Sequence, residues 1–132
     1  MLVAKILHST IANGVVKSMD ISAAQALPGV VKVVTCFDVP DIQFPTPGHP
    51  WSVEKAHQDI SDRKLLASRV RYYGDDIAAV VAEDTVTADR ALKLIRVEYE
   101  EYPVCLDPEE SMRGGGIPIH QEYPNNVLAH MD

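Results

Sequence analysis

The stretch GDDIAAVVAEDTVTADRALKLIRVEYE, from Gly74 to Glu100, carries the patterns that decide the fold. Its segment from Ile77 to Glu83, which is apolar as far as Ala82, is typical of a strand. Asp84 follows in the position of a helix N-cap, and apolar residues then recur with the spacing of one helix face, at Ala88, Ala91, Leu92 and Ile95. From Val97 to Glu101 apolar and charged residues alternate, which predicts a strand with one buried face.

This order of strand, helix and strand predicts a right-handed crossover that joins the two strands in parallel and places the helix over the sheet. Asp89 and Lys93 are expected to form an i,i+4 ion pair on the polar side of the helix. Leu92 is expected to be buried, so that Leu92→Ala costs about 2 to 5 kcal/mol of stability.

The first half of the chain contains further turn and cap signals. Asn13-Gly14 favours a hairpin turn between two antiparallel strands. Ser22 and Gln25 have the spacing of a capping box, which predicts a short helix, and Leu27-Pro28-Gly29 ends it. The β-branched run from Val30 to Cys36 predicts a well-buried strand. A second hairpin is expected at Gly74-Asp75-Asp76, where glycine and aspartate are favoured turn residues.

A long irregular segment interrupts these patterns. Four prolines between Pro40 and Pro50 remove backbone donors and restrict the residues before them, so this stretch is expected to be a loop. Together with polar residues up to Lys64 it forms a segment of the kind that is often functional or covered by a partner. Trp51 is interpreted as a hydrophobic anchor of this loop rather than a ligand-stacking residue.

Composition excludes several classes of function. The 132 residues suffice for one core, and 46% hydrophobic with 23% charged residues is normal for a globular protein. A net charge of −7 and the lack of a basic patch argue against nucleic-acid binding. Apolar runs are too short for membrane spans and no signal peptide is recognised, so a cytoplasmic protein is expected. Cys36 and Cys105 are interpreted as small hydrophobic residues.

Acidic residues are the first candidates for chemistry. Asp75 and Asp76 are interpreted as turn residues, because a solvated hairpin tip does not separate the pKa values of an acid pair. Glu98 and Glu100 share one strand face with Arg96, which favours ordinary charge mixing over cation binding. Acidic residues after Leu106 are expected to begin a helix, with proline in its first turn, at Asp107, Glu109 and Glu110.

The remaining candidates do not form recognised sites either. The five histidines do not have metal-ligand spacing: His8, His49, His57, His120 and His130. Gly114-Gly115-Gly116 lacks the residues of a phosphate loop and is interpreted as a flexible connector. Ser9, Ser22 and Ser111 lack the surroundings of a nucleophile elbow. No residue is therefore predicted as catalytic, cofactor-binding or metal-binding.

The order of segments resembles the α/β hammerhead domain of the xanthine dehydrogenase and aldehyde oxidase family, the opening part of its molybdenum-binding chain. The resemblance is carried by MLVAKILHS, MDISAAQALPGVVKVVTCFDVP, the long run VRYYGDDIAAVVAEDTVTADRALKLIRVEYEEYPVCLDPEES and IPIHQEYPNNV. The insert from Gln43 to Leu66 is unmatched. Where the family often has Arg-Ser-Pro-His after the first strand, this chain has His8-Ser9-Thr10-Ile11.

The resemblance implies an α+β hammerhead fold: one compact domain over residues 1–132, with a mixed β-sheet, a strand-helix-strand crossover and short helices. Residues 39–66 are then an irregular insert and 113–132 a C-terminal exit segment, and the chain is expected to be excised from a larger one. The implied function is that of an N-terminal, non-catalytic domain of a molybdenum hydroxylase that oxidises purines, related heterocycles or aldehydes.

In such an enzyme the molybdenum-molybdopterin cofactor and the catalytic residues belong to later domains, and iron-sulfur clusters and FAD belong to other domains or subunits. The implied partners are the remaining molybdenum-binding domains of the same chain. Two alternatives remain open on the sequence: a free-standing module that binds a small molecule or peptide through the proline-rich loop, and a small hydrolase that uses Asp75 or Glu100.

Overall fold

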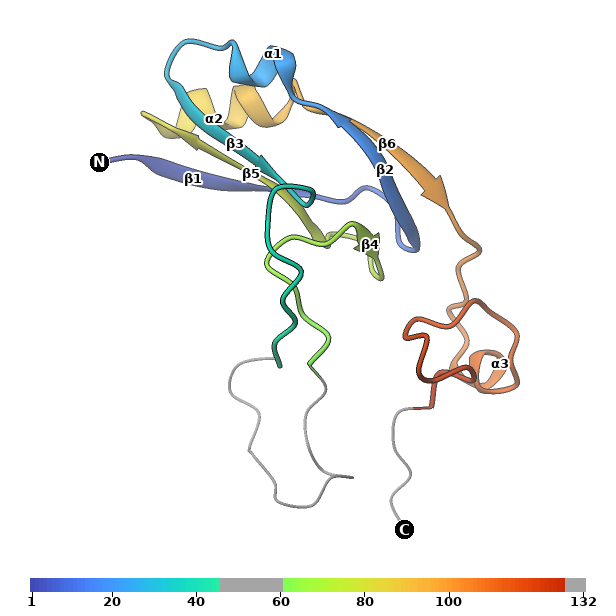
Figure 1. The fold of residues 1–132 in the computed structure, drawn as a ribbon. Helices are drawn as coiled ribbons and strands as arrows, with labels where there is room; N and C mark the ends of the chain where they lie inside the picture. The colour runs from blue at the N-terminus through green and yellow to red at the C-terminus, as the bar shows by residue number, and fades with distance from the viewer. Residues whose placement is uncertain (46–60, 128–132) are drawn as a thin grey trace. The chain divides into compact units, whose positions relative to one another are not determined.

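The structure is a computed structural model, which describes residues 1–45 and 61–127. It consists of two compact units. The first is formed by Met1–Asp41 and Leu65–Glu101, and the second by Ile42–Lys64 and Tyr102–Asp132. Within the described residues, the first unit contains all the named strands and two of the named helices (Figure 1). The first unit is therefore the strand-rich body, and the second unit is the smaller of the two.

The first sheet has the order β1-β5-β3. Its central strand, β5 (Asp76–Ala82), pairs antiparallel with both neighbours, β1 (Val3–His8) and β3 (Val30–Thr35). The register is interrupted where β1 meets the start of β5, so that Leu7 pairs with Ala78 and the next residue, His8, pairs with Asp76. A bulge of this kind bends the strand and changes the direction of side chains at its end.

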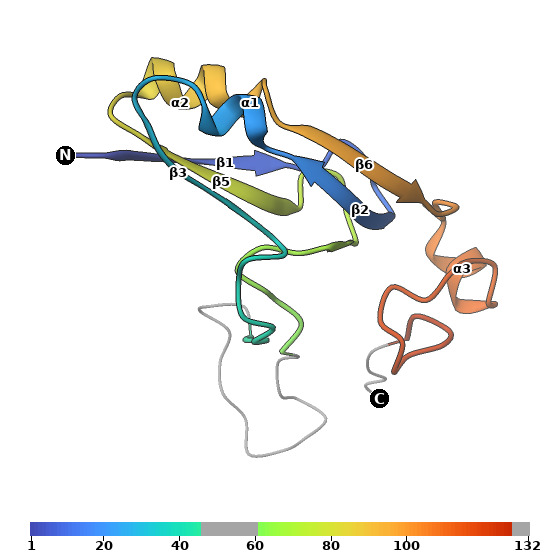
Figure 2. The same cartoon turned by 45° about the horizontal axis from the view of Figure 1, so that its top comes forward.

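The second sheet has the order β4-β2-β6. Its central strand is β2 (Gly14–Asp20), which pairs antiparallel with β4 (Arg69–Val70) and with β6 (Arg96–Glu101). Figures 1 and 2 both show β2 and β6 side by side. Gly14 is required here, because a Cβ at this position would lie 2.3 Å from the carbonyl oxygen of Glu100 and 2.6 Å from Cδ1 of Ile11.

The strand pairings differ from those predicted. The segments on either side of Asn13-Gly14 do not form a hairpin, since β1 and β2 belong to different sheets. The same is true of β4 and β5, which flank Gly74. The crossover is wrong as well, because β5 and β6 lie in different sheets and both sheets are wholly antiparallel. Each consecutive pair of strands is divided between the two sheets, which bury their apolar faces on adjoining cores.

Two helices cover one side of the first sheet, as both views of the ribbon show (Figures 1 and 2). The longer one, α2 (Thr85–Leu92), confirms the predicted N-cap, because the Asp84 carboxylate accepts the backbone N–H of Thr87 at 2.8 Å. The predicted partner of Asp89 was wrong. Asp89 pairs instead with Lys5 of β1 at 2.7 Å, which ties the helix to the sheet.

The short helix α1 (Ser22–Gln25) forms as predicted, but without the capping box. Ser22 donates from its backbone nitrogen and from its hydroxyl to the Asp20 carboxylate, at 3.0 and 2.6 Å. These two hydrogen bonds hold the pKa of Asp20 below its usual range. A charged acceptor two residues away therefore replaces the Gln25 contact, in keeping with the strength of hydrogen bonds to ionised groups. Gly29, with φ of 89°, ends the helix region as expected.

The core consists of two adjoining clusters. One lies between the first sheet and the helices, with fully buried residues at Ala24, Val33, Val80, Ala82, Ala88 and Ala91. The other joins the two sheets and is formed by Ile11, Val16, Val70 and Ile77. The predicted helix face is confirmed, although α2 ends at Leu92 and Ile95 reaches the core from the turn that follows. Leu92 is only partly buried against the cluster.

The second unit contains α3 (Pro108–Met112), which begins as predicted with Asp107 as N-cap and a proline in the first turn. Asp107 accepts the backbone N–H of Glu109 at 2.8 Å. Two ends of the insert meet in an isolated antiparallel bridge between Phe44 and Arg63. The rest of the predicted loop, with Trp51, lies outside the described residues. The Gly114 to Gly116 connector is not open throughout, because a Cβ at Gly115 would lie 2.9 Å from the Glu110 carbonyl oxygen.

Candidate functional site

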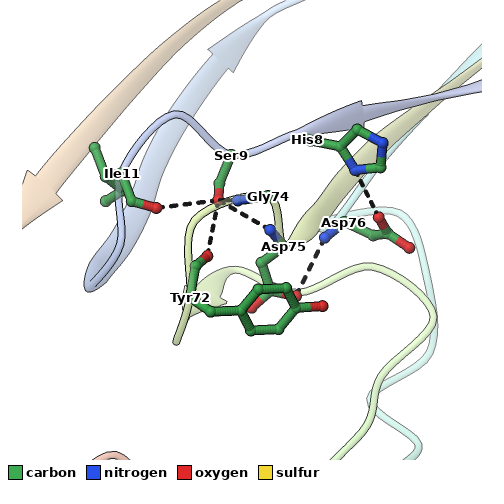
Figure 3. Close-up of polar contacts among 7 residues, drawn as sticks. All are labelled: His8, Ser9, Ile11, Tyr72, Gly74, Asp75 and Asp76. Atoms are coloured by element: carbon green, nitrogen blue, oxygen red, sulfur yellow. Dashed lines mark hydrogen bonds and ion pairs between the residues drawn. The ribbon is translucent and has the colours of Figure 1, made fainter. Parts of the chain in front are cut away.

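The hydroxyl of Ser9, just after β1, makes hydrogen bonds with four backbone groups of the first unit. The side chain is buried, with 2% of its surface exposed. Its Oγ accepts the backbone N–H groups of Gly74 and Asp75, at 3.2 and 3.1 Å, and faces the carbonyl oxygens of Ile11 and Tyr72, at 3.2 and 3.3 Å (Figure 3). We call Ser9, Tyr72, Gly74 and Asp75 the Ser9 corner.

The hydrogen-bonding capacity of this hydroxyl is fully used. A serine oxygen has two acceptor lone pairs and one proton to donate. Both lone pairs receive backbone N–H groups, and the proton is shared between two carbonyl oxygens. The backbone of Ser9 also takes part: its N–H donates to Asp75 O at 2.8 Å, and its carbonyl oxygen shares the Gly74 N–H with the hydroxyl, at 3.1 Å. Ser9 therefore locks the end of β1 to the turn that leads into β5.

His8 and Asp76 form a polar contact next to this corner. Nδ1 of His8 lies 2.9 Å from a carboxylate oxygen of Asp76, and the two residues are register partners across β1 and β5 (Figure 3). The pair faces water, since 59% of the His8 side chain is exposed. Ser9 and His8 are neighbours in the chain, but one is buried and the other is in solvent.

Asp75 is less solvated than the sequence suggested. Burial raises the pKa of its carboxyl above the ordinary value of 3.8, although the backbone N–H groups of Arg71 and Asp76 donate to it and lower the pKa in part. These two hydrogen bonds measure 3.2 and 3.1 Å. The turn role of Asp75 is confirmed, because its carboxylate binds the backbone on both sides of Gly74. The solvated hairpin tip is wrong, since the turn packs against Ser9.

Serine, histidine and aspartate thus come together without the geometry of a hydrolase. Nucleophilic catalysis needs the hydroxyl within hydrogen-bond reach of a base. The Ser9 hydroxyl is instead occupied by backbone groups, and the His8 ring is bound to Asp76. The arrangement can order the backbone at this corner, but it does not activate Ser9.

The acidic residues of β6 form ordinary surface contacts. Glu98 accepts a hydrogen bond from Ser18 at 2.9 Å, and Glu100 pairs with Lys17 at 2.7 Å, both across the β2–β6 pairing. All four residues are exposed. The predicted solvated face is confirmed, with the difference that the balancing cation of Glu100 comes from β2.

The two cysteines are free thiols. Cys36 packs against the second core cluster, and burial raises its pKa to about 11. A thiol with such a pKa remains protonated at neutral pH and is a poor nucleophile. Cys105 in the second unit donates weakly to the Asp107 carbonyl oxygen at 3.4 Å. The interpretation as a small hydrophobic residue is confirmed for Cys36.

Nothing in residues 1–45 and 61–127 brings together three histidine, cysteine, aspartate or glutamate side chains that would hold a metal ion. His120 lies 3.5 Å from Asp62 and meets Tyr123 edge to face, both within the second unit. His49, His57 and His130 lie outside the described residues. The donor set of the described residues therefore does not fit a metal centre. No helix in this part of the chain has the length and apolar character of a membrane span.

The sequence is similar to a family model and to several known proteins. The sequence model described as "Aldehyde oxidase and xanthine dehydrogenase, a/b hammerhead domain" matches residues 1–103. The xanthine dehydrogenase molybdenum-binding subunit of Escherichia coli O157:H7 is 43% identical over 120 residues, which cover 91% of this chain and 16% of that protein. The carbon monoxide dehydrogenase large chain of Afipia carboxidovorans is 33% identical over 129 residues, or 96% of this chain and 15% of that protein.

Solved structures agree with this assignment. The aldehyde oxidoreductase from Desulfovibrio gigas superimposes with a TM-score of 0.77 at 29% identity, over 93% of this chain and 14% of that one. The chain thus spans about one sixth of the length of the curated relatives it matches. The α+β hammerhead fold expected from the sequence is confirmed. The chain belongs to the aldehyde oxidase and xanthine dehydrogenase family and forms its a/b hammerhead domain.

Proposed function

We propose that this chain is the non-catalytic hammerhead domain of a xanthine dehydrogenase-like molybdenum hydroxylase. The complete enzyme would oxidise a purine, a related heterocycle or an aldehyde. The observation that carries the proposal is the 43% identity to a protein named as a xanthine dehydrogenase molybdenum-binding subunit, over 91% of this chain. The Ser9 corner supports the non-catalytic part, because its hydroxyl is occupied by four backbone groups.

The cofactor of the proposed enzyme is molybdenum-molybdopterin, held by parts of the enzyme other than this chain. The donor set of the described residues does not fit a metal, so no chemical step is assigned to this chain. The proposed role is structural: the domain packs against the catalytic domains, and the segment from Pro40 to Leu66 shapes access of the substrate.

The proposed partners are the other molybdenum-binding domains of the same chain, with iron-sulfur and FAD domains or subunits beyond them. One relative, 34% identical over 113 residues, is named as a subunit of a 6-hydroxypseudooxynicotine dehydrogenase complex, which favours a multi-subunit parent. The cytoplasmic location expected from the sequence stays a prediction.

The comparisons favour this function over the two alternatives. The binding module depends on a proline-rich loop that lies largely outside the described residues. The hydrolase needs Asp75 or Glu100 as an essential group. Asp75 is bound to the backbone of its own turn, and Glu100 is paired with Lys17 on an exposed strand.

The test is made on the full-length parent enzyme with its companion subunits. Turnover of xanthine, hypoxanthine and an aldehyde is measured with an artificial electron acceptor and divided by the molybdenum content. We expect turnover that depends on the substrate. The kcat per molybdenum of Asp75→Asn and of Glu100→Gln should lie within about twofold of that of the unsubstituted enzyme. An essential acid or base contributes about 10² to 10⁴-fold to the rate.

Two results would contradict the proposal. A complete enzyme that contains no molybdenum and turns over none of the three substrates would reject the parent activity. A fall in kcat of more than a hundredfold in Asp75→Asn or Glu100→Gln, at unchanged molybdenum content, would reject the non-catalytic role. Lys17→Gln is the matched control, because it removes the partner of Glu100 and leaves the carboxylate in place.

A further inference from the structure

The first sheet has one covered face and one open face. On the covered side, the odd-numbered residues of β1 point toward the helices: Leu7 packs on the core below them, and Lys5 pairs with Asp89 of α2. Figures 1 and 2 both show α1 and α2 on this one side of β1, β5 and β3. Side chains alternate along a strand, so the even-numbered residues of β1 point to the opposite face.

The strand register defines what lies on that opposite face. Ile6 pairs with Ala79, which pairs in turn with Val34, so that one apolar row crosses all three strands. The neighbouring row consists of Ala4, Val81 and Lys32. We call these six residues the open face.

Each residue of the open face retains contact with solvent. Ile6 is 38% exposed, Ala4 and Lys32 are exposed, and Ala79, Val81 and Val34 are partly exposed. The partial exposure of Ala79 and Val81 is informative, because β5 is the central strand of the sheet. In the same strand Val80 and Ala82, which point toward the helices, are completely buried. The difference between alternate residues of one strand shows that, among the described residues of the first unit, only one side of the sheet is covered.

The outer face of the second sheet provides a comparison within the same unit. There charged and polar residues pair across the strands, as Lys17 does with Glu100 and Ser18 with Glu98, and Val15 is the apolar residue opposite Glu100. An antiparallel sheet that meets water on one face normally has this alternation. The open face of the first sheet lacks it, since five of its six residues are apolar. Its composition is that of a surface that another apolar layer covers.

We propose that the open face is a docking surface for the remaining part of the same parent chain. This inference rests on the proposed function. The matched region makes up only 16% of the relative named as a xanthine dehydrogenase molybdenum-binding subunit, so a parent chain of that length has much further polypeptide in the same molecule. The surface of the parent chain that docks there is expected to be apolar where it contacts Ile6, Ala79 and Val34.

Polar groups mark the borders of the docking surface. Lys32 lies in the row of Ala4 and Val81 on one side, and the polar contact between His8 and Asp76 lies beyond the row of Ile6 on the other. An apolar centre with a polar border is typical of interfaces between protein surfaces. The Ser9 corner, directly behind His8, orders the end of this border through its four backbone contacts.

The experiment is thiol labelling of the full-length parent enzyme. Cys36 and Cys105 are replaced by serine, and single cysteines are introduced as Ile6→Cys, Ala4→Cys or, on the outer face of the second sheet, Ser18→Cys. A small maleimide is added, and the modification of each peptide is followed by mass spectrometry. We expect Ile6→Cys and Ala4→Cys to react at least tenfold more slowly than Ser18→Cys in the native enzyme, and all three at similar rates in urea.

Equal native rates at the three positions would overturn the proposal. Protection of Ile6→Cys that disappears when the companion subunits are removed would also overturn it, because a different subunit would then be the occupant. Protection that depends on protein concentration would overturn it as well, because a second copy of the chain would then be the occupant. The result is independent of catalysis. If the enzyme lacks molybdenum hydroxylase activity but the two positions remain protected, the proposed function fails and the docking surface stands.

Discussion

The hydroxyl of Ser9 accepts the backbone N–H of Asp75 at 3.1 Å, although 66 positions separate the two residues in the chain. This contact joins the end of β1 to the start of β5 at the point where the register between them shifts. Buried backbone donors need partners, because an unsatisfied one costs free energy comparable to a lost hydrogen bond. The serine supplies that partner where the strand pairing no longer does.

Replacement of Ser9 by alanine is expected to destabilise the protein by about 1 to 3 kcal/mol, because a buried donor then lacks its acceptor. The free energy of unfolding is measured by urea denaturation. Ser18→Ala is the control, since it removes a hydroxyl that is bonded to Glu98 at an exposed position; its effect should stay within about 0.5 kcal/mol. Equal effects of the two substitutions would show that the Ser9 corner is not a structural lock.

Asp75 is expected to make the stability depend on pH. Burial raises its folded-state pKa above the ordinary value of 3.8, so protonation of this group favours the folded state. That contribution is present below pH 3.8 and is lost as the pH rises through the folded-state pKa. The stability of the unsubstituted protein relative to Asp75→Asn should therefore decrease from pH 3 toward neutrality, as measured by denaturation at several pH values.

Asp84 provides the control of opposite sign. Hydrogen bonds from the backbone and side chain of Thr87 lower its pKa below 3.8, so its contribution is present above that pH and is lost as the pH falls through the folded-state pKa. The stability of the unsubstituted protein relative to Asp84→Asn should increase with pH. If both comparisons changed in the same direction, burial would not determine the titration of Asp75.

Ile77 should contribute more to stability than Leu92. Ile77 is completely buried between the two sheets, whereas Leu92 is only partly buried at the end of α2. We expect Ile77→Ala to cost about 2 to 5 kcal/mol and Leu92→Ala to fall at or below about 2 kcal/mol. Denaturation midpoints of the two variants decide this order, and a larger effect at Leu92 would contradict the position of the core.

Gly14→Ala should be more damaging than Gly74→Ala. At Gly14 the new Cβ would lie 2.3 Å from a backbone oxygen of β6, which cannot move without disturbing the strand pairing. At Gly74 nothing lies within 4 Å, and only the positive φ of 95° opposes a side chain. We expect about 1 to 2 kcal/mol at Gly74, and a loss above about 3 kcal/mol at Gly14. Thermal unfolding of both variants tests the order.

The sequence predicts only part of the candidate site. The turn interpretation is confirmed for Asp75, because aspartate is favoured in turns whatever surrounds it, but it is wrong for Asp76, which is the first residue of β5 and pairs with His8. The sequence around Ser9 has no nucleophile motif, and no local pattern predicts that its hydroxyl binds the backbone at Gly74 and Asp75. One signal pointed to it: serine is the residue that His8-Ser9-Thr10-Ile11 shares with the family's Arg-Ser-Pro-His.

Local sequence patterns predict four features of the elements correctly: the cap at Asp84, the inward face of α2, the alternation in β6 and the start of α3 at Asp107. These depend on residues within a few positions of one another, where spacing and backbone preference are sufficient. The tertiary structure alone decided which strands pair. Local patterns do not encode the partner of a strand, and here each consecutive pair is divided between two sheets because the adjoining cores must both be covered.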